Sequence, residues 1–332
     1  MSTTRTGRLE LRPFILDTDI GGEPDDALAL VVAAGYPELS LVVTSDEHAG
    51  RRARLARHLL DLLGRTDVPV VAGRDLGNEH RWAADDLVPR IVPEQRTDVV
   101  DAIGGLLERT ESPIGWIGIG ALSNLADVIE SIPAANTRLV VTQMGGSHTA
   151  FTDHPEPNFG LDLQAARTVL AAGLRPGLLP AEVTTHFINV INRDSIEYDF
   201  IARTSDPVCQ LLLRHMDQWF DNFRSNISQQ APLTLGYGMG VQYVVASETT
   251  IGLDDVGRIS TGDLPVFLAR SADYSAFEEW FIPRLSTAKS TSTTHPAAQR
   301  WLAQVDPQPP SQDVSGLDVY HLYNQRPTER YS

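Results

Sequence analysis

Short apolar runs alternate along the chain with longer stretches in which apolar residues recur every three or four positions. The runs predict buried strands, and the stretches predict amphipathic helices. The expected strands lie at 13–19, 39–45, 68–73, 114–120 and 137–146, with a further strand ending the stretch 174–183. The expected helices lie at 24–35, 49–64, 121–132, 162–173, 206–224 and 277–285. This alternation predicts an α/β fold with a mostly parallel, doubly wound open sheet flanked by helices.

The stretch "AGRRARLARHLLDLLG" (49–64) has a strongly two-sided pattern. Its leucines at 55, 59, 62 and 63 fall on one side of a helix, which we expect to face the core. We expect the arginines of this helix to point outward.

The pattern also predicts how the chain divides. Residues 1–285 carry the strand and helix signals and form one α/β domain. The following "STAKSTSTTHPAAQ" is rich in Ser and Thr and low in apolar residues. We therefore expect 286–332 to be a C-terminal extension, either loosely structured or packed on the domain.

Composition narrows the class of partner. The 332 residues include 43 acidic and 27 basic side chains, a formal net charge of −16. This balance disfavours nucleic acids and anionic membranes, and it favours a small molecule or a metal ion. The single cysteine, Cys209, rules out an internal disulfide and a cysteine-based zinc site. With no apolar stretch of membrane-spanning length, we expect a cytoplasmic protein.

The segment "DTDIGGEPDDALAL" places four aspartates and one glutamate in ten positions between the first strand and the first helix. Asp17 and Asp19 are two residues apart at the end of the strand, so their side chains are expected to point to the same face. Asp25 and Asp26 occupy the first helical turn, where the helix dipole favours carboxylates. Like charges at this density repel unless a cation lies among them. Oxygen ligands suit calcium or magnesium, whereas carboxylates would repel a phosphate. The alternative is that Asp25 and Asp26 only cap the helix while Asp17 and Asp19 are solvated.

The acidic segment resembles the signature of the inosine–uridine-preferring nucleoside hydrolase family, which often reads DTDPG-x-DDA. The version here is two residues longer between Asp19 and Asp25. Five further segments resemble the family and follow in its order. They are "VVTSDEHAG", "IGIGALSNLADV", "VVTQMGG", "EPNFGLDLQAA" and "APLTLG". The resemblance extends over about 13–285.

This resemblance implies a hydrolase that cleaves the N-glycosidic bond of a ribonucleoside through a metal-bound water. It implies that Asp19 is a calcium ligand and the general base, and that Asp26 is a bidentate ligand. The backbone carbonyl of Ile119 would complete the ligand set, and Asp17 would orient the ligands by hydrogen bonding. The resemblance also suggests a homodimer or homotetramer.

The resemblance implies roles for four substrate-binding residues as well. Asp25 would bind the 2′-hydroxyl, and Asp46 falls where many members carry an asparagine near the sugar. Glu156 and Asn158 match the pair that holds the 5′ and 2′ sides of the ribose. Three further side chains are weaker candidates: Glu23 as a metal ligand, and His148 and His154 as contacts to the base or the sugar.

One segment departs from the family. Its H-D-P-L stretch reads Gln230-Ala231-Pro232-Leu233 in this chain. Ala231 cannot ligate a metal, and Gln230 cannot donate a proton as the family histidine can, so we expect calcium to bind weakly. Two alternatives stay open. The first is a repurposed or catalytically weak protein that acts on or binds a modified ribosyl compound in a biosynthetic pathway. The second is a non-enzymatic subunit that pairs with an active paralogue.

Overall fold

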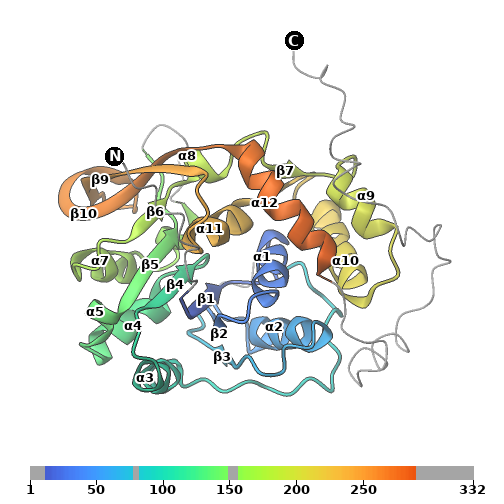
Figure 1. Cartoon of the computed structure of the whole chain (residues 1–332), viewed down its shortest axis with the longest axis horizontal. Coiled ribbons are helices and arrows are strands. Elements are labelled where there is room, and N and C mark those ends of the chain that lie inside the picture. The colour runs from blue at the N-terminus through green and yellow to red at the C-terminus, as the bar shows by residue number, and fades with distance from the viewer. Residues whose placement is uncertain (1–11, 78–81, 149–155, 289–332) are drawn as a thin grey trace, which may run out of the picture.

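An eight-stranded sheet forms the centre of the protein in a computed structural model that describes residues 12–77, 82–148 and 156–288. The strand order is β3-β2-β1-β4-β5-β6-β10-β9, and all neighbours are parallel except β9, which runs antiparallel to β10 (Figure 1). The strands are β1 (Phe14–Thr18), β2 (Leu39–Thr44), β3 (Val70–Ala72), β4 (Ile114–Gly118), β5 (Leu139–Met144), β6 (Gly177–Leu179), β9 (Val244–Leu253) and β10 (Ile259–Ala272). The mostly parallel open sheet expected from the sequence is therefore confirmed.

Helices cover both faces of the sheet. They are α1 (Asp25–Ala34), α2 (Arg51–Leu62), α3 (Val99–Arg109), α4 (Ser123–Ser131), α5 (Ala135–Arg138), α6 (Pro157–Gly160), α7 (Leu163–Ala171), α8 (Ala181–Thr184), α9 (Ile196–Ala202), α10 (Pro207–Asn222), α11 (Gln230–Gly238) and α12 (Tyr274–Thr287). A small antiparallel pair, β7 (Val190–Ile191) and β8 (Ile227–Ser228), lies outside the main sheet.

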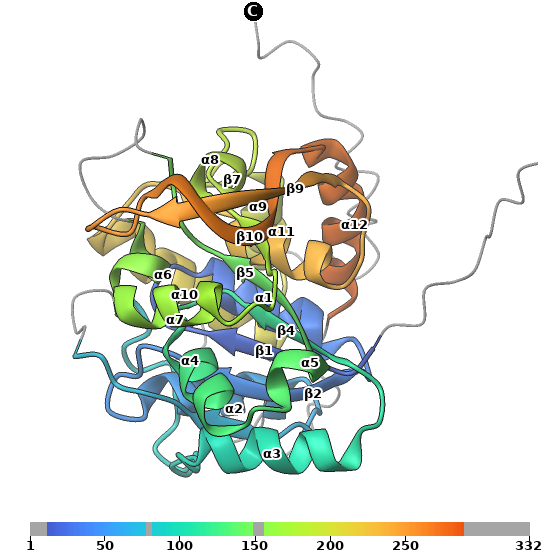
Figure 2. The ribbon, with the colours of Figure 1, turned by 90° about the vertical axis from the view of Figure 1, so that its left-hand side faces the viewer.

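Each face of the sheet has its own apolar core. Residues of α1, α2, α10, α11 and α12 build the larger cluster. Residues of α3, α4 and α7 build the other, and these helices lie in front of the strands in Figure 2. Burial of the sheet on both sides explains why its central strands read as nearly continuous apolar runs.

The predicted end of one strand is wrong. The stretch 174–183 ends in a helix, since β6 stops at Leu179 and α8 begins at Ala181. The carbonyl of Pro180 accepts hydrogen bonds from the backbone N–H groups of Val183 and Thr184. These bonds turn the chain away from the sheet after three strand residues.

The strand order changes direction at β1. From β1 the chain first adds β2 and β3 on one side, and it then returns to add β4, β5 and β6 on the other. Asp17 of β1 lies opposite Gly118 of β4 at the carboxyl ends of these two strands. In doubly wound folds, ligands bind in the crevice at this edge, outside the carboxyl ends of neighbouring strands whose connections leave in opposite directions.

Within the described segments, no helix is both long enough and apolar enough to cross a membrane.

Candidate functional site

The acidic loop, defined as residues 17–26, leaves β1 at the crevice and enters α1. Gly21 is in the left-handed region at φ 103°, and a side chain at this position would overlap the ring of Trp82. The carbonyl of Gly21 also accepts a hydrogen bond from the backbone N–H of Ala83, at 2.8 Å. A glycine is therefore required where the loop turns beneath Trp82.

Asp17 lies behind the crevice in the sheet. Its side chain is buried, and the amide of Asn124 donates to its Oδ1 at 3.1 Å. Burial raises the pKa of Asp17 to about 8, while the bond from Asn124 opposes the shift. The backbone carbonyl of Asp17 accepts from the N–H of Ile119 at 2.8 Å, which ties the acidic loop to the end of β4.

Asp25 and Asp26 begin α1, and both carboxylates are buried. The Thr18 hydroxyl donates to Asp26 Oδ1. Burial, followed by the charges of Glu23 and Asp26, raises the pKa of Asp25. Burial, followed by the charge of Asp19, raises the pKa of Asp26. These carboxyl groups therefore lie close enough to repel one another, as the sequence pattern indicates.

The segment that departs from the family lies against these carboxylates. Ala231 is in the first turn of α11, and its backbone N–H donates to Asp25 Oδ2 at 3.0 Å. The neighbouring Gln230 accepts a hydrogen bond from the Thr184 hydroxyl at its Oε1. Glu23 accepts from the backbone N–H of Ser228 at 2.6 Å, so it links the acidic loop to the segment that leads into α11.

The other side of the crevice comes from β4, β5 and α6. The Asn158 amide donates to the carbonyl of Ile119 at 3.0 Å and to that of Met144 at 3.1 Å. Gly120 allows the end of β4 to approach the acidic loop, because a Cβ at this position would lie 2.9 Å from the backbone nitrogen of Asp19. Ile119, Asn158 and Asp19 are thus brought to one place, as the family resemblance implies.

Glu156 is the N-cap of α6. Its carboxylate accepts backbone N–H bonds from Gly146 at 2.8 Å, Asn158 at 3.1 Å and Phe159 at 3.0 Å. Burial raises the pKa of Glu156, and these three bonds lower it. The same carboxylate therefore organises the turn that holds Asn158 against Ile119.

Arg52 contradicts the expectation that the arginines of 49–64 point outward. Its side chain is 1% exposed. Its Nε donates to the carbonyl of Asp46 at 2.6 Å, and its Nη2 pairs with Asp46 Oδ2 at 3.2 Å. Its Nη1 donates to the carbonyls of Asp19 and Ile20, the latter at 3.1 Å. The periodicity contained the signal, because position 52 lies three residues before Leu55 and seven before Leu59 on the apolar side of the helix.

Asp46 follows β2 at the same edge of the sheet, and its carboxylate faces Arg52. Its backbone has φ 47°, a left-handed conformation that aspartate adopts more readily than most residues. Asp46 is therefore near the crevice, where the resemblance places a residue beside the sugar.

Trp82 is a site residue that the sequence reasoning missed. Its ring lies over Gly21. The centroid of the Trp82 ring is 5.5 Å from the centroid of the His48 ring and 5.7 Å from the guanidinium carbon of Arg51. A half-buried aromatic face therefore borders the acidic loop.

The two histidines expected near the base or the sugar are not placed at the acidic loop by any described contact. His148 donates through its backbone N–H to Glu182 Oε1 at 2.5 Å, and His154 lies outside the described residues.

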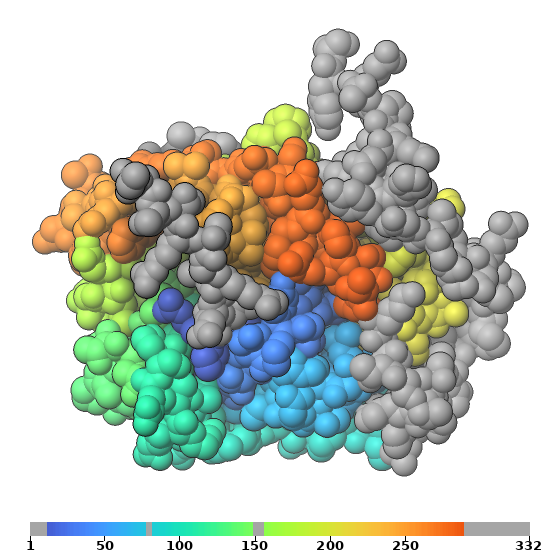
Figure 3. Space-filling model, in the orientation of Figure 1, coloured from blue at the N-terminus to red at the C-terminus, as the bar shows by residue number. Residues whose placement is uncertain are grey.

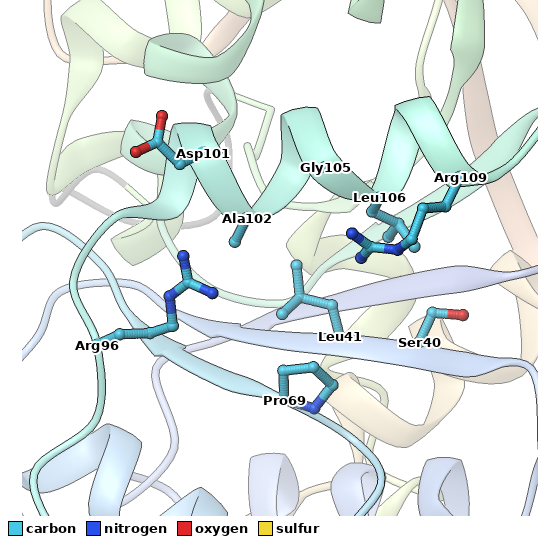
Figure 4. A pocket seen from close by; sticks show the side chains of 9 residues that line it. All are labelled: Ser40, Leu41, Pro69, Arg96, Asp101, Ala102, Gly105, Leu106 and Arg109. Carbon is cyan, nitrogen blue, oxygen red and sulfur yellow. The ribbon is translucent and has the colours of Figure 1, made fainter.

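A cavity of about 230 Å³ lies away from the acidic loop. It is beneath α3, at the amino ends of β2 and β3, and its walls include Leu41, Pro69, Arg96 and Arg109 (Figure 4). Because the acidic loop follows the carboxyl end of β1, this cavity is not part of the candidate site.

Comparison with known proteins agrees with this arrangement. Residues 14–262 match the model of the family described as inosine-uridine preferring nucleoside hydrolase. The chain belongs to this nucleoside hydrolase family.

Individual relatives are distant in sequence, and solved structures of low identity share the fold. The pyrimidine-specific ribonucleoside hydrolase RihA of Enterobacter sp. (strain 638) is 26% identical over 275 residues, which cover 75% of this chain and 86% of the relative. The purine-preferring ribonucleoside hydrolase from Gardnerella vaginalis has a TM-score of 0.70 at 19% identity, covering 84% of this chain and 100% of that one. The type III effector protein XopQ, solved with adenosine diphosphate ribose, has a TM-score of 0.65 at 18% identity, covering 84% and 95%.

The donor set of this nucleoside hydrolase fits a divalent cation only in part. Asp19 and Asp26 supply carboxylates and Ile119 supplies a carbonyl, all oxygen donors of the type that calcium prefers. The repulsion between Asp19 and Asp26 is also of the kind that a cation relieves. However, among residues 12–77, 82–148 and 156–288 no group of three or more His, Cys, Asp or Glu side chains is arranged to hold a metal ion.

Proposed function

We propose that this protein hydrolyses the N-glycosidic bond of a ribonucleoside. The observation that carries the proposal is the convergence of the acidic loop with Ile119 and Asn158 at the point where the strand order reverses. Membership of the nucleoside hydrolase family supports the same reaction class. The base of the substrate is left open, since the relatives differ in their named preferences.

In this proposal Asp19 is the general base. Its side chain is partly exposed, whereas Asp25 and Asp26 are 3% and 6% exposed, so Asp19 is the carboxylate of the three most accessible to water. The water oxygen attacks C1′ of the ribose and gives its proton to Asp19 as the base leaves with the bonding electrons. Asp25, Asp46, Glu156 and Asn158 would bind or orient the sugar.

Protonation of the leaving base is the weak step. The Gln230 amide is no acid, and its Oε1 already accepts a bond from Thr184. Solvent must then protonate the base, or the base must leave as an anion. This favours substrates whose bases leave readily, and it is consistent with a slow enzyme.

Calcium is the metal that we propose, held by Asp19, Asp26 and the Ile119 carbonyl. When bound, calcium would lower the pKa of a water molecule and orient it. Calcium affinity depends on the number of charged ligands, so the loss of one carboxylate weakens it. Calorimetric titration should give a dissociation constant at least about tenfold higher for the natural chain than for its Ala231→Asp variant. Equal affinities would show that position 231 does not face the ion.

The reaction is tested with purified protein, calcium and a panel of purine and pyrimidine ribonucleosides. We expect free ribose from at least one of them, and none when the ribonucleoside is replaced by its 2′-deoxy form if Asp25 binds the 2′-hydroxyl. If no ribonucleoside of the panel releases ribose although calcium binding has been verified, hydrolysis of common ribonucleosides is rejected.

A second function, binding of a ribosyl compound without efficient hydrolysis, is favoured by Gln230 and Ala231. XopQ, which shares the fold, was solved with adenosine diphosphate ribose. Calorimetry with adenosine diphosphate ribose, on a protein that releases no ribose from the panel, distinguishes the two functions. Saturable binding supports the second function, and the absence of any heat of binding contradicts it.

The proposal includes a cytoplasmic location and a homodimeric or homotetrameric assembly. The single cysteine suits a reducing compartment, and the family resemblance suggests the assembly. Sedimentation of the purified chain measures the assembly directly.

A further inference from the structure

A buried guanidinium lies beneath the acidic loop, although the helix that carries it was expected to expose its arginines. The Arg52 side chain is 1% exposed, and its charge is paired with Asp46, whose side chain is 0% exposed. Burying one charge pair leaves the net charge of the site unchanged. The guanidinium nevertheless lies directly against the backbone of the acidic loop.

The hydrogen bonds of Arg52 reach the acidic loop itself. Its Nη1 donates to the backbone carbonyls of Asp19 and Ile20, so it fixes the direction in which the chain leaves β1. These are the residues that carry the general base of the proposed reaction. A guanidinium suits this task because its donors are fixed in one plane and its charge is permanent.

The charge of Arg52 acts on the acidic side chains as well. Burial and the charge of Asp19 raise the pKa of Asp26, and Arg52 acts in the opposite direction. A positive group therefore lies near the Asp26 carboxylate, which is one of the two proposed as metal ligands.

We propose that Arg52 is a built-in cation of the acidic loop, which holds the loop in its folded geometry when no divalent ion is bound. Asp46 and Arg52 form a neutral pair, so Asp46, which the proposed function places beside the sugar, adds no further negative charge. The proposal makes Arg52 a positioning residue, and it holds whether or not the protein releases ribose.

Thermal melting in EDTA and in millimolar calcium chloride tests the proposal. For the natural chain we expect the two melting temperatures to agree within about 1 °C, because weak calcium binding adds little stability. Arg52→Gln should melt on the order of 5 °C lower in EDTA, and calcium should restore at least about half of the loss. Arg52→Lys keeps the charge but loses the planar set of donors. It should be destabilised without a gain from calcium.

The matched control is Arg57→Gln on the same helix. Arg57 is also largely buried, donates to the carbonyls of Arg65 and Val68, and pairs with Asp61. Its loss should lower the melting temperature without creating a response to calcium. A calcium response of Arg52→Gln no larger than that of Arg57→Gln would overturn the proposal.

The double variant Asp46→Asn with Arg52→Gln separates two roles of Arg52 and leaves no unpaired charge at position 46. If Arg52 serves the acidic loop, the double variant still gains stability from calcium. If it regains the natural melting temperature in EDTA and ignores calcium, Arg52 only neutralises Asp46 and the proposal is wrong. Should Arg52→Gln be insoluble, this variant carries the same comparison.

Discussion

Asp19 differs from its neighbouring aspartates because water can reach it. Asp25 and Asp26 are enclosed by α1 and α11, and Asp26 also accepts a bond from Thr18. A carboxylate that removes a proton from water must be accessible and ionised. Accessibility therefore supports Asp19, the residue immediately after β1, as the proposed general base of the acidic loop.

Replacing Asp19 by asparagine tests this assignment. The amide cannot accept a proton, so ribose release should fall by about 10²-fold or more, while the melting temperature stays near that of the natural chain. Asp101→Asn, on the exposed side of α3, is the control and should retain full activity. Unchanged ribose release by Asp19→Asn would assign the base to another residue.

His58 gives a second prediction, which concerns stability rather than catalysis. It is fully buried in α2, and neither ring nitrogen has a hydrogen-bond partner among the described residues. Burial lowers the pKa of His58 to about 4 from the ordinary 6.5. As the pH falls below about 6.5 the unfolded chain binds a proton that the folded chain refuses, so stability is lost until the pH reaches about 4.

His58→Leu should remove this contribution. Between pH 7.5 and pH 5 the free energy of unfolding should fall in both proteins, and the fall should be smaller in the variant by about 2 kcal/mol. Urea denaturation at the two pH values measures the difference. Part of the pH dependence should persist, because burial also lowers the pKa of His215 to about 4. Identical pH dependence in both proteins would mean that His58 gains a proton, or a partner, in the folded state.

Among the elements, α11 begins with residues 230–233, the segment in which the sequence differs from the family motif that it resembles. Its first turn places the Ala231 N–H on Asp25, so a longer side chain at 231 would begin beside the buried carboxylates. The neighbouring Pro232 and Leu233 already match the family stretch. We therefore expect the backbone at 231 to accommodate a carboxylate side chain.

Ala231→Asp combined with Gln230→His rebuilds that stretch. The aspartate should strengthen calcium binding and the histidine should protonate the leaving base, so ribose release should rise by about 10²–10⁴-fold. Gln230→His alone, which also loses the bond from Thr184, is the matched control. A double variant that melts lower and releases no more ribose would mean that the pocket no longer accommodates a third carboxylate, because an unpartnered buried charge costs stability.

The elements also show where sequence patterns succeed. The first five strands and helices α1, α2 and α4 were predicted, because burial on both faces makes each strand an apolar run. Helix α3, between β3 and β4, was not predicted. The long hairpin of β9 and β10 was missed. Many of its residues are exposed or half-buried polar ones, and in the main sheet it pairs with β6 at only two positions, Phe267 with Gly177 and Leu268 with Leu178. Its position depends on distant contacts rather than on local periodicity.

The site was predictable to a similar extent. The sequence places the acidic loop at the sheet edge, and the structure brings Ile119 and Asn158 to the same edge. Trp82 could not be assigned by the same reasoning, and Arg52 was expected to point outward although its position falls on the apolar side of the helix. A buried arginine is uncommon, and the periodicity alone does not show that Arg52 pairs with Asp46 and donates to the carbonyls of Asp19 and Ile20. Trp82 reaches Gly21 from a connection with no regular structure of its own.

At the scale of the whole molecule, α12 closes the larger apolar core. Phe277 and Phe281 are fully buried, and Trp280 is 8% exposed. The helix contacts α1 and α11, and its orange surface lies against the blue of α1 in Figure 3. It therefore supports the two helices that carry Asp25, Asp26 and Ala231.

This packing leads to a prediction about the C-terminal extension. The sequence predicts a domain that ends near residue 285, and α12 ends at Thr287. A chain stopped after Ala288 keeps every buried residue of α12, so its melting temperature should stay within about 2 °C and its ribose release should be unchanged. A chain stopped after Asp273 loses three large buried rings. Each costs about 3–5 kcal/mol to remove, against a total stability of about 5–15 kcal/mol, so this chain should not fold. If stopping after Ala288 lowers the melting temperature as strongly as a core deletion does, the extension packs on the domain and belongs to the folded unit.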